Sequence, residues 1–256
     1  MSHQDEVLQR SVDNLSNDAL RSAAHAFTRD SIDPKYSYNF SWLGRPIIQY
    51  PQDIVAMQEI IWSVQPDLII ETGIAHGGSL IFSASMLELN AACGGPKDAE
   101  VLGIDVDIRA HNREAIVAHP MARRISMIQG SSIAPDVVAK VHTKAAGKRS
   151  VLVCLDSNHT RDHVLAELLA YAPLTTVGSY CVVFDTLIED MPHDAYPDRP
   201  WAPGNNPKTA VFEYLRRLAA QPSSGADGTS LAFEIDKRID GKLLISVAPD
   251  GYLKRI

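Results

Sequence analysis

The sequence predicts an α/β protein built on a doubly wound, mostly parallel seven-stranded sheet. The main observation is a series of five short apolar runs that alternate with helical patterns, and a second is a pair of apolar runs near the C-terminus. Alternation of this kind is typical of a parallel sheet that helices cover on both faces. The five runs are DLIIE (67–71), VLGID (101–105), RISMI (124–128), SVLVCL (150–155) and SYCVVF (179–184).

The two C-terminal runs predict how the sheet ends. LAFEI (231–235) and LLISV (243–247) are separated by DKRIDGK, and we expect no helix between them. Strands joined by so short a polar connection pair in an antiparallel hairpin. The sequence therefore predicts a C-terminal antiparallel hairpin at the edge of the sheet.

The first 65 residues are predicted to form an N-terminal cap of helices and aromatic residues. Residues 5–28 have a polar helical pattern, and residues 52–65 place apolar side chains on one helical face. Between them, KYSYNFSWLGRPIIQYP (35–51) is too irregular for a long helix. Residues 66–256 are expected to form one compact domain, and its proline-rich loop 187–206 is expected to act as a lid.

The composition excludes several classes of protein. Hydrophobic residues make up 45% of the 256 residues, enough for a substantial core, and the formal net charge is −7. An acidic chain without a long basic run is a poor binder of nucleic acid or of a membrane surface. No apolar stretch reaches the ~18 residues of a membrane span, and the polar N-terminus lacks a signal-peptide pattern. Together with three cysteines, an odd number, these features predict a cytoplasmic protein with free thiols.

A glycine-rich loop follows the first predicted strand and indicates a cofactor site. In IIETGIAHGGSLI, Gly73, Gly77 and Gly78 permit a tight turn and a close approach of the backbone to a ligand. The spacing departs from the GxGxxG of dinucleotide-binding loops. Glu71 at the strand end would repel a pyrophosphate, whereas it suits the cationic amino-acid end of S-adenosylmethionine. The alternative is an ordinary tight turn in which Ser79 caps the helix.

Other residues near strand ends are candidate contacts of the same cofactor. Asp105 closes the second strand, where it is placed to accept hydrogen bonds from ribose hydroxyls. Asp107 is an alternative ribose partner or a cap of the next helix. Ser131 and Ser132 follow the third strand, and they are interpreted equally well as adenine contacts or as helix N-caps. His76, inside the glycine loop, is a further candidate contact.

An acidic cluster is predicted where the fourth and fifth strands end. Asp156 and Asp185 should lie side by side, because adjacent parallel strands end at the same edge of the sheet. Two neighbouring carboxylates repel each other unless a cation lies between them, and a divalent ion such as Mg²⁺ fits oxygen ligands. Glu189 and Asp190 are expected to complete the metal shell. His159 is a candidate proton acceptor, although it could also be a solvent-facing residue at a helix start.

Seven segments of the chain together resemble the cephalosporin hydroxylase/rhamnosyl O-methyltransferase family. The resemblance extends from about residue 36 to the C-terminus. It implies a Rossmann-like class I methyltransferase that depends on S-adenosylmethionine and Mg²⁺. The segments are YNFSWLGRPIIQYPQDIVAMQEIIW, DLIIETGIAHGGSLIFSASML, VLGIDVDIR, LDSNHT, VVFDTLIEDMP, RPWAPGNNPKTAVFEYL and LLISVAPDGYLKRI.

The resemblance also implies roles for individual residues. Asp156 matches the first metal aspartate of the family and Asp185 its acidic position after the fifth strand. β-Lactam members have an adjacent Glu-Asp pair there, where this chain has Phe184 and Asp185. His159 takes the place of the lysine base of related catechol-type enzymes. The residues that match the family's cofactor motif are Glu71, Gly73, Gly77, Gly78 and Asp105.

The predicted reaction is methyl transfer to a hydroxyl of a small-molecule acceptor, expected to contain a sugar, by a homo-oligomer. The alternatives are an NAD-dependent oxidoreductase, a component of cephem hydroxylation or methoxylation, and a non-catalytic cofactor-binding protein. Aromatic side chains of the cap and of the loop stack well on sugars, although they are equally well interpreted as ordinary core. These aromatic residues are Tyr36, Tyr38, Phe40, Trp42, Tyr196 and Trp201.

Overall fold

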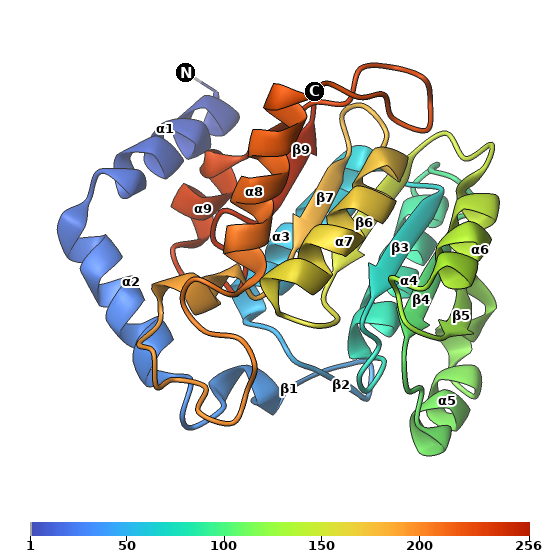
Figure 1. Cartoon of the computed structure of the whole chain (residues 1–256), viewed down its shortest axis with the longest axis horizontal. Helices are drawn as coiled ribbons and strands as arrows, with labels where there is room; N and C mark the ends of the chain where they lie inside the picture. Colours follow the sequence, from blue (N-terminus) through green and yellow to red (C-terminus); the bar gives the residue numbers. More distant parts are fainter. Residues whose placement is uncertain (1) are drawn as a thin grey trace.

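The computed structural model describes residues 2–256, in which a seven-stranded sheet lies between two layers of helices (Figure 1). The strand order is β5-β4-β3-β6-β7-β9-β8, and every pair is parallel except those of β9, which runs antiparallel to β7 and β8. The predicted doubly wound sheet and its C-terminal antiparallel hairpin are therefore confirmed. The strands and helices are α1 (His3–Leu15), α2 (Asp18–Asp30), η1 (Tyr36–Asn39), β1 (Phe40–Trp42), β2 (Arg45–Ile47), α3 (Pro51–Val64), β3 (Leu68–Thr72), α4 (Gly78–Ala92), β4 (Glu100–Asp105), α5 (Ala110–Val117), η2 (Pro120–Arg124), β5 (Ile125–Gln129), α6 (Pro135–Ala145), β6 (Val151–Leu155), α7 (Arg161–Tyr171), η3 (Ala172–Leu174), β7 (Tyr180–Val183), η4 (Thr186–Asp190), α8 (Pro207–Ala220), β8 (Phe233–Ile235), α9 (Lys237–Leu243) and β9 (Tyr252–Arg255).

The two helical layers follow from the alternation of side chains along buried strands. In β3, Leu68 and Ile70 pack into the core beneath α6, α7 and α8, whereas Ile69 packs into the opposite core with α3 and α4. Successive side chains of a strand point to opposite faces, so an uninterrupted apolar run requires a helical cover on both sides. Figure 1 shows α6, α7 and α8 on the near side of the sheet.

The strand order creates a crevice at the carboxyl edge of the sheet. The chain extends the sheet in one direction through β4 and β5 and then returns to place β6 on the other side of β3. Thr72 is paired with Leu155, and Leu155 is paired with Val183, so β3, β6 and β7 end level with one another. Ligands of such sheets bind where the strand order reverses, beyond the carboxyl ends.

The N-terminal segment differs in part from the expectation. The single helix predicted over 5–28 is two helices, because Asn17 interrupts it and accepts a hydrogen bond from Leu20 N (3.1 Å) as the N-cap of α2. The irregular segment 35–51 and the helix over 52–65 are as predicted. Residues 32–64 pack into the same core as the sheet, and the proposed division of the chain at residue 65 stays a prediction.

The position of the last strand was predicted incorrectly. The segment 243–247 is not a strand, and α9 occupies the connection in which no helix was expected. Asp236 caps α9 by accepting a hydrogen bond from Arg238 N (3.2 Å). The strand that pairs with β8 is instead β9, where Tyr252 and Leu253 are fully buried.

A buried carboxyl group of α3 holds the segment after α9 away from the sheet ladder. Asp53 accepts hydrogen bonds from Ser246 Oγ (2.6 Å), Val247 N (2.9 Å) and Tyr252 OH (2.7 Å). The amide of Val247, which a strand would pair with its neighbour, therefore has a side-chain partner instead. Burial raises the pKa of Asp53 to about 6.

Two smaller expectations about the chain have clear outcomes. Cys154 and Cys181 are buried free thiols, as their apolar surroundings predicted. Over residues 2–256, none of the helices combines the length and apolar composition that crossing a membrane requires.

Candidate functional site

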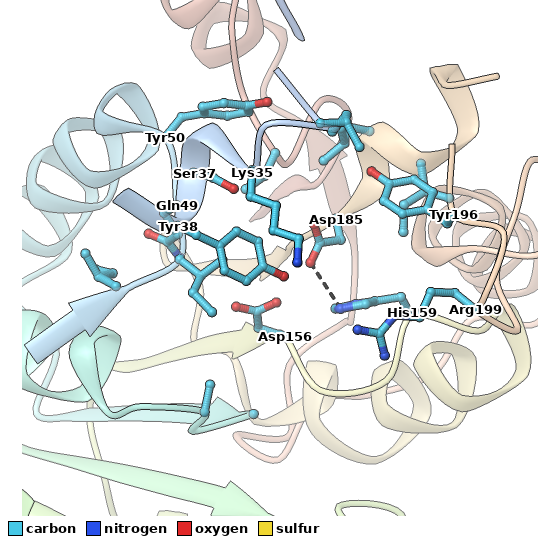
Figure 2. A pocket seen from close by; sticks show the side chains of 18 of the residues that line it. Lys35, Ser37, Tyr38, Gln49, Tyr50, Asp156, His159, Asp185, Tyr196 and Arg199 are labelled. Carbon is cyan, nitrogen blue, oxygen red and sulfur yellow. Dashed lines mark ion pairs between the residues drawn. The ribbon is translucent and has the colours of Figure 1, made fainter. Parts of the chain in front are cut away.

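A cavity of about 800 Å³ opens at the carboxyl edge of β3, β6 and β7. Its walls come chiefly from four parts of the chain: the segment 32–50, the glycine loop 73–79, the residues that follow β6 and β7, and residues 195–201 of the loop that was predicted to act as a lid. Figure 2 shows Lys35, Tyr38 and Tyr196 pointing into the space that Asp156 and Asp185 face. Cavities of a few hundred to a thousand cubic ångströms are typical of small-molecule sites.

The glycine loop is shaped by close backbone contacts that exclude a side chain. Gly73 has φ +88°, and a Cβ atom there would lie 2.0 Å from the carbonyl oxygen of Asp156. At Gly78, the first residue of α4, a Cβ atom would lie 2.1 Å from the carbonyl oxygen of Pro46 in β2. The loop is thus pressed against the end of β6 on one side and against the cap on the other. His76 lines the cavity, and its carbonyl oxygen accepts a hydrogen bond from Arg45 Nε (3.0 Å).

Glu71 lies beneath the glycine loop as a buried carboxyl group. It is 4% exposed, and it accepts a hydrogen bond from Ser79 Oγ at the start of α4. Burial raises the pKa of Glu71 to about 7, although the hydrogen bond from Ser79 opposes the shift. Ser79 therefore faces the predicted cofactor acid rather than capping the backbone of α4, which has no side-chain cap.

Asp105 fastens the glycine loop to the end of β4. Its Oδ2 accepts hydrogen bonds from Ile74 N (2.8 Å) and Ala75 N (3.3 Å), and its Oδ1 accepts one from Asp107 N (2.9 Å). Each carboxylate oxygen has about two lone pairs, so Oδ1 keeps acceptor capacity for a ligand. Asp107 does not cap α5, whose N-cap is Arg109, and that interpretation was wrong.

Ser131 and Ser132 lie in the loop after β5 but do not border the cavity. Neither is an N-cap, because α6 begins at Pro135 with Ala134 as its N-cap, so the capping interpretation was wrong. Ser132 Oγ lies 3.1 Å from His163 Nε2 on α7. The contact of these serines with an adenine stays a prediction.

The acidic cluster forms as its strand-end positions predicted. Asp156, His159 and Asp185 each present a ligand atom, and these three atoms lie within 4.8 Å of one another. His159 Nε2 is 3.2 Å from Asp185 Oδ2 (Figure 2). The pKa of Asp156 lies well above its ordinary value, first because the group is buried and then because the charge of Asp185 is close. The neutral form of Asp156 is therefore favoured in the ligand-free site.

The backbone is strained where it lines this cavity. Lys35, Ala75 and Asp185 all border the cavity and all adopt the left-handed region, with φ of 53°, 45° and 54°. This region costs residues other than glycine free energy, and it is concentrated at functional sites. The conformation of Asp185 directs its carboxylate toward Asp156 and His159 instead of along the axis of β7.

Glu189 and Asp190 do not join the cluster, and their predicted role as metal ligands is corrected. Glu189 Oε2 accepts hydrogen bonds from Gly204 N (2.7 Å) and from Asn206 Nδ2. Asp190 forms an ion pair with Lys208 of α8. The η4 turn after Asp185 carries both acids away from the sheet edge, whereas His159 enters the cluster from the loop after β6.

The aromatic residues divide between cavity and core. Tyr38, Tyr196 and Trp201 line the cavity. Trp42 packs against Phe82 at the outer end of the cap and donates a hydrogen bond from Nε1 to Ser85 Oγ (2.9 Å). Tyr36 and Phe40 contact each other beside the cap helices.

Two cationic side chains of the cavity were not found from the sequence. Lys35 and Arg199 line the cavity from the cap and from the lid, and neither has a carboxylate within 4.0 Å among residues 2–256. A single basic residue in an irregular segment has no periodicity or motif to distinguish it. Only the left-handed conformation of Lys35 marks it out, and that conformation is a property of the fold.

Comparison with known proteins gives relatives over most of the chain. The family model described as rhamnosyl O-methyltransferase/CmcI matches residues 34–256. A rhamnosyl O-methyltransferase of Mycobacterium leprae (strain TN) is 31% identical over 220 residues, which cover 84% of this chain and 82% of that protein. One of Mycobacterium bovis (strain BCG / Pasteur 1173P2) is 32% identical over 146 residues, which cover 55% of this chain and 54% of that protein.

Two solved structures share the fold of this chain. The apo structure of CmcI-N160 has a TM-score of 0.51 and 19% identity, covering 86% of this chain and 77% of that one. A complex of the MycE methyltransferase of the mycinamycin biosynthetic pathway with Mg, SAH and mycinamycin VI has a TM-score of 0.50 and 14% identity, covering 89% of this chain and 54% of that one. At these identities the likeness establishes the fold.

Proposed function

The chain belongs to the rhamnosyl O-methyltransferase/CmcI family, and on that premise we propose that it transfers a methyl group from S-adenosylmethionine to a sugar hydroxyl with the help of Mg²⁺. The observation that carries the proposal is the meeting of Asp156, His159 and Asp185 beside the glycine loop. A rhamnosyl group is the acceptor that the names of the relatives suggest.

Asp156 and Asp185 are the residues that would hold the metal ion. Their carboxylates face the same point, and the raised pKa of Asp156 reflects its burial and the nearby charge of Asp185. Carboxylate oxygens are preferred ligands of Mg²⁺, which usually keeps other positions for water or substrate. When bound, Mg²⁺ would supply the positive charge that lowers the pKa of an acceptor hydroxyl.

The glycine loop and Glu71 would hold the cofactor. The close packing at Gly73 leaves the backbone of the loop bare toward the cavity, and the carboxyl group of Glu71 suits the ammonium group of S-adenosylmethionine. Oδ1 of Asp105 would accept a hydrogen bond from a ribose hydroxyl, because its contact with Asp107 N leaves a lone pair free. His76, Gly77, Gly78 and Ser79 belong to the same loop and the first turn of α4, and they are proposed as further cofactor contacts.

His159 is proposed as the proton acceptor for the acceptor hydroxyl. The imidazole faces the acidic cluster, and a neutral imidazole has one nitrogen that donates a hydrogen bond and one that can accept a proton. Asp185 would orient the ring by accepting a hydrogen bond from Nε2 (3.2 Å to Oδ2), which leaves Nδ1 as the nitrogen that can accept the proton. Because the methyl donor carries its own leaving group, the residues of the site chiefly provide position, charge and exclusion of water.

The acceptor would lie between the cap and the lid. Tyr38 and Tyr196 face this space together with Trp201, and the faces of aromatic rings stack well on the apolar faces of sugars. Lys35 and Arg199 add hydrogen-bond donors that hydroxyl groups can use.

The first test is which ligands stabilise the purified protein. S-adenosylmethionine and MgCl₂ are each expected to raise the melting temperature, since a ligand at 100 times its Kd adds about 2.7 kcal/mol to the free energy of unfolding. Asp156→Asn should lose the response to MgCl₂ and keep the response to the cofactor. Glu213→Gln, on the outer side of α8, is the matched control and should keep both.

The second test is methyl transfer to a defined acceptor. Methyl α-L-rhamnopyranoside and other simple glycosides are incubated with S-adenosylmethionine labelled on its methyl group, and methylated sugar is detected by mass spectrometry. Stabilisation by NAD instead of S-adenosylmethionine would refute the proposal in favour of an oxidoreductase. Cofactor binding with no methyl transfer to any glycoside would reject the sugar acceptor.

A further inference from the structure

We propose that Trp201 is a positioning residue for His159. Glu189 contributes indirectly, because it accepts hydrogen bonds from the turn that carries Trp201 and so holds that turn in place. This inference rests on the proposed function, because it assigns His159 the proton-accepting role. If it is correct, the loop 187–206 positions a side chain of the site as well as bordering the cavity.

The contact between the two rings fixes the imidazole. The ring centroids of His159 and Trp201 are 4.7 Å apart, and the ring planes meet at 80°, an edge-to-face arrangement. On its other side, Nε2 of His159 contacts Asp185 Oδ2 at 3.2 Å. A single hydrogen bond leaves a ring free to rotate about it, whereas a second contact on the ring itself defines the plane. His159 is therefore held from two elements that come from different parts of the chain.

Trp201 is held in turn by a tight, hydrogen-bonded turn. Ala202 and Asn205 exchange two backbone hydrogen bonds, from Ala202 N (3.2 Å) and from Asn205 N (2.9 Å). Asn206, which is fully buried, donates from Nδ2 to the carbonyl oxygen of Ala202 (2.9 Å). The residue after Trp201 is thus bonded at both its amide and its carbonyl group, so the backbone that carries Trp201 has little freedom.

Glu189 is the anchor of this turn. Its Oε2 accepts from Gly204 N (2.7 Å) and from Asn206 Nδ2. Among residues 2–256 it has no lysine, arginine or histidine within 4.0 Å, so its charge is directed to the turn and not to an ion pair. Hydrogen bonds to an ionised acceptor are stronger than those between neutral groups. Glu189 lies on η4, whose N-cap is Asp185, so its hydrogen bonds join the turn to the element that directly follows the acidic cluster.

The turn is also tied to the element that carries His159. Asn205 Oδ1 accepts a hydrogen bond from Arg161 N (3.1 Å), the first residue of α7 and only two residues after His159. Residues 192–194 and 197–200 of the lid are exposed, whereas residues 206–208 are buried. The stem of the lid is therefore part of the fixed structure, and Trp201 lies where that stem meets the cavity.

The test compares variants of Trp201 and Glu189 with matched controls. Trp201→Ala removes the ring, Trp201→Phe keeps an aromatic edge, and Glu189→Gln keeps the size but puts an amide donor toward two other donors. Trp62→Ala removes a half-exposed tryptophan of α3, away from the cavity, and Asp194→Asn removes a charge from the exposed part of the lid.

The first readout needs no acceptor. In metal-free, ¹⁵N-histidine-labelled protein at fixed pH, the ring current of Trp201 displaces the His159 imidazole resonances, which are assigned by their absence in His159→Gln. Trp201→Ala and Glu189→Gln should shift these resonances in the same direction, while Trp201→Phe, Trp62→Ala and Asp194→Asn leave them near their wild-type positions. Unchanged resonances in Trp201→Ala would overturn the proposal.

The second readout is steady-state methyl transfer to methyl α-L-rhamnopyranoside. Trp201→Ala should lower kcat on the order of 10²-fold, the effect of misplacing a reacting group by about 1 Å, with KM for the cofactor nearly unchanged. Trp201→Phe should recover most of that loss. A rise in KM with unchanged kcat would mean that Trp201 only binds the acceptor, and it would also overturn the proposal.

The two readouts separate failure of this proposal from failure of the proposed function. If wild-type protein methylates none of the glycosides, the function fails, whereas the imidazole resonances still decide whether Trp201 and Glu189 position His159. If Trp201→Ala does not fold, Glu189→Gln decides alone: a His159 spectrum identical to wild type would overturn the proposal.

Discussion

Glu71→Gln is expected to change the way in which stability depends on pH. Glu71 is 4% exposed, its carboxyl group has Ser79 Oγ as hydrogen-bond partner, and burial raises its pKa from 4.5 to about 7. Between about pH 4.5 and pH 7, the folded state therefore holds a proton that the unfolded state has released. The contribution of Glu71 to the free energy of unfolding is complete below pH 4.5 and is lost as the pH rises through 7. The reason is that this free energy changes with pH in proportion to the number of protons bound by the unfolded state minus the number bound by the folded state.

The size of the effect follows from the pKa shift. The difference of about 2.5 pKa units, at 1.36 kcal/mol per unit, corresponds to about 3 kcal/mol between pH 4 and pH 8. Glutamine has nearly the same shape and does not ionise. Relative to wild type, Glu71→Gln should therefore gain about 3 kcal/mol of unfolding free energy over that interval.

The assay is urea unfolding at a series of pH values, without cofactor and with EDTA present. The quantity to follow is the difference between the variant and wild type, since acids remote from Glu71 titrate equally in both. Asp156 is the exception, because the charge of Glu71 contributes to its raised pKa. Glu213→Gln is the control: ion pairs with Arg216 and Arg217 hold the pKa of Glu213 at about 2, so its difference curve should be flat above pH 5. A flat curve for Glu71→Gln from pH 4 to pH 8 would refute the assignment of a buried, uncompensated acid.

Two further substitutions test the packing around the site. Gly73→Ala should lower the free energy of unfolding by at least about 3 kcal/mol, because the strain of the left-handed backbone adds to a clash with the backbone of Asp156. Gly94→Ala is the control, since Gly94 has a similar φ but open space around it, and it should show the cost of the strain alone. Equal urea midpoints for the two variants would contradict this prediction. Lys208→Met should cost about 1.5–3 kcal/mol by chemical unfolding, because Asp190 and Asp250 both lose the buried ammonium group, although Asp250 keeps its ion pair with Lys237. A change under 1 kcal/mol would show that these ion pairs are solvated.

The parts of the site that the sequence predicted depend on strand ends. Asp156 and Asp185 each follow an apolar run, and the geometry of parallel strands alone brings such residues to the same edge. The same reasoning located Glu71 and the glycine loop. None of these predictions needed knowledge of the loops, because the position of a strand end in a parallel sheet is set by the sheet.

The errors concern residues whose partners lie far away in the sequence. Glu189 was assigned to the metal from its distance along the chain, but its hydrogen bonds go to Gly204 and Asn206 in the stem of the lid. The last strand was placed on 243–247 because that run is more apolar than 252–255. Arg255 in β9 is nevertheless buried, since its guanidinium group pairs with Asp227. A buried charge whose partner lies elsewhere in the chain gives no sign of burial in the sequence.

The electrostatics of the ligand-free site account for the kind of ligand that it should bind. The pKa values of Glu71 and Asp156 are both raised by burial, so keeping either group ionised costs free energy in the empty protein. Asp185 adds a second carboxylate beside Asp156 on a strained backbone. A ligand binds such a site most tightly when it brings positive charge to both acids, because its binding offsets the free-energy cost of keeping these buried groups ionised. A cofactor with an ammonium and a sulfonium group, together with a divalent cation, brings charge to both places. A neutral or anionic dinucleotide would increase the penalty at Glu71, and its binding should weaken as the pH rises through 7, whereas binding of S-adenosylmethionine should strengthen.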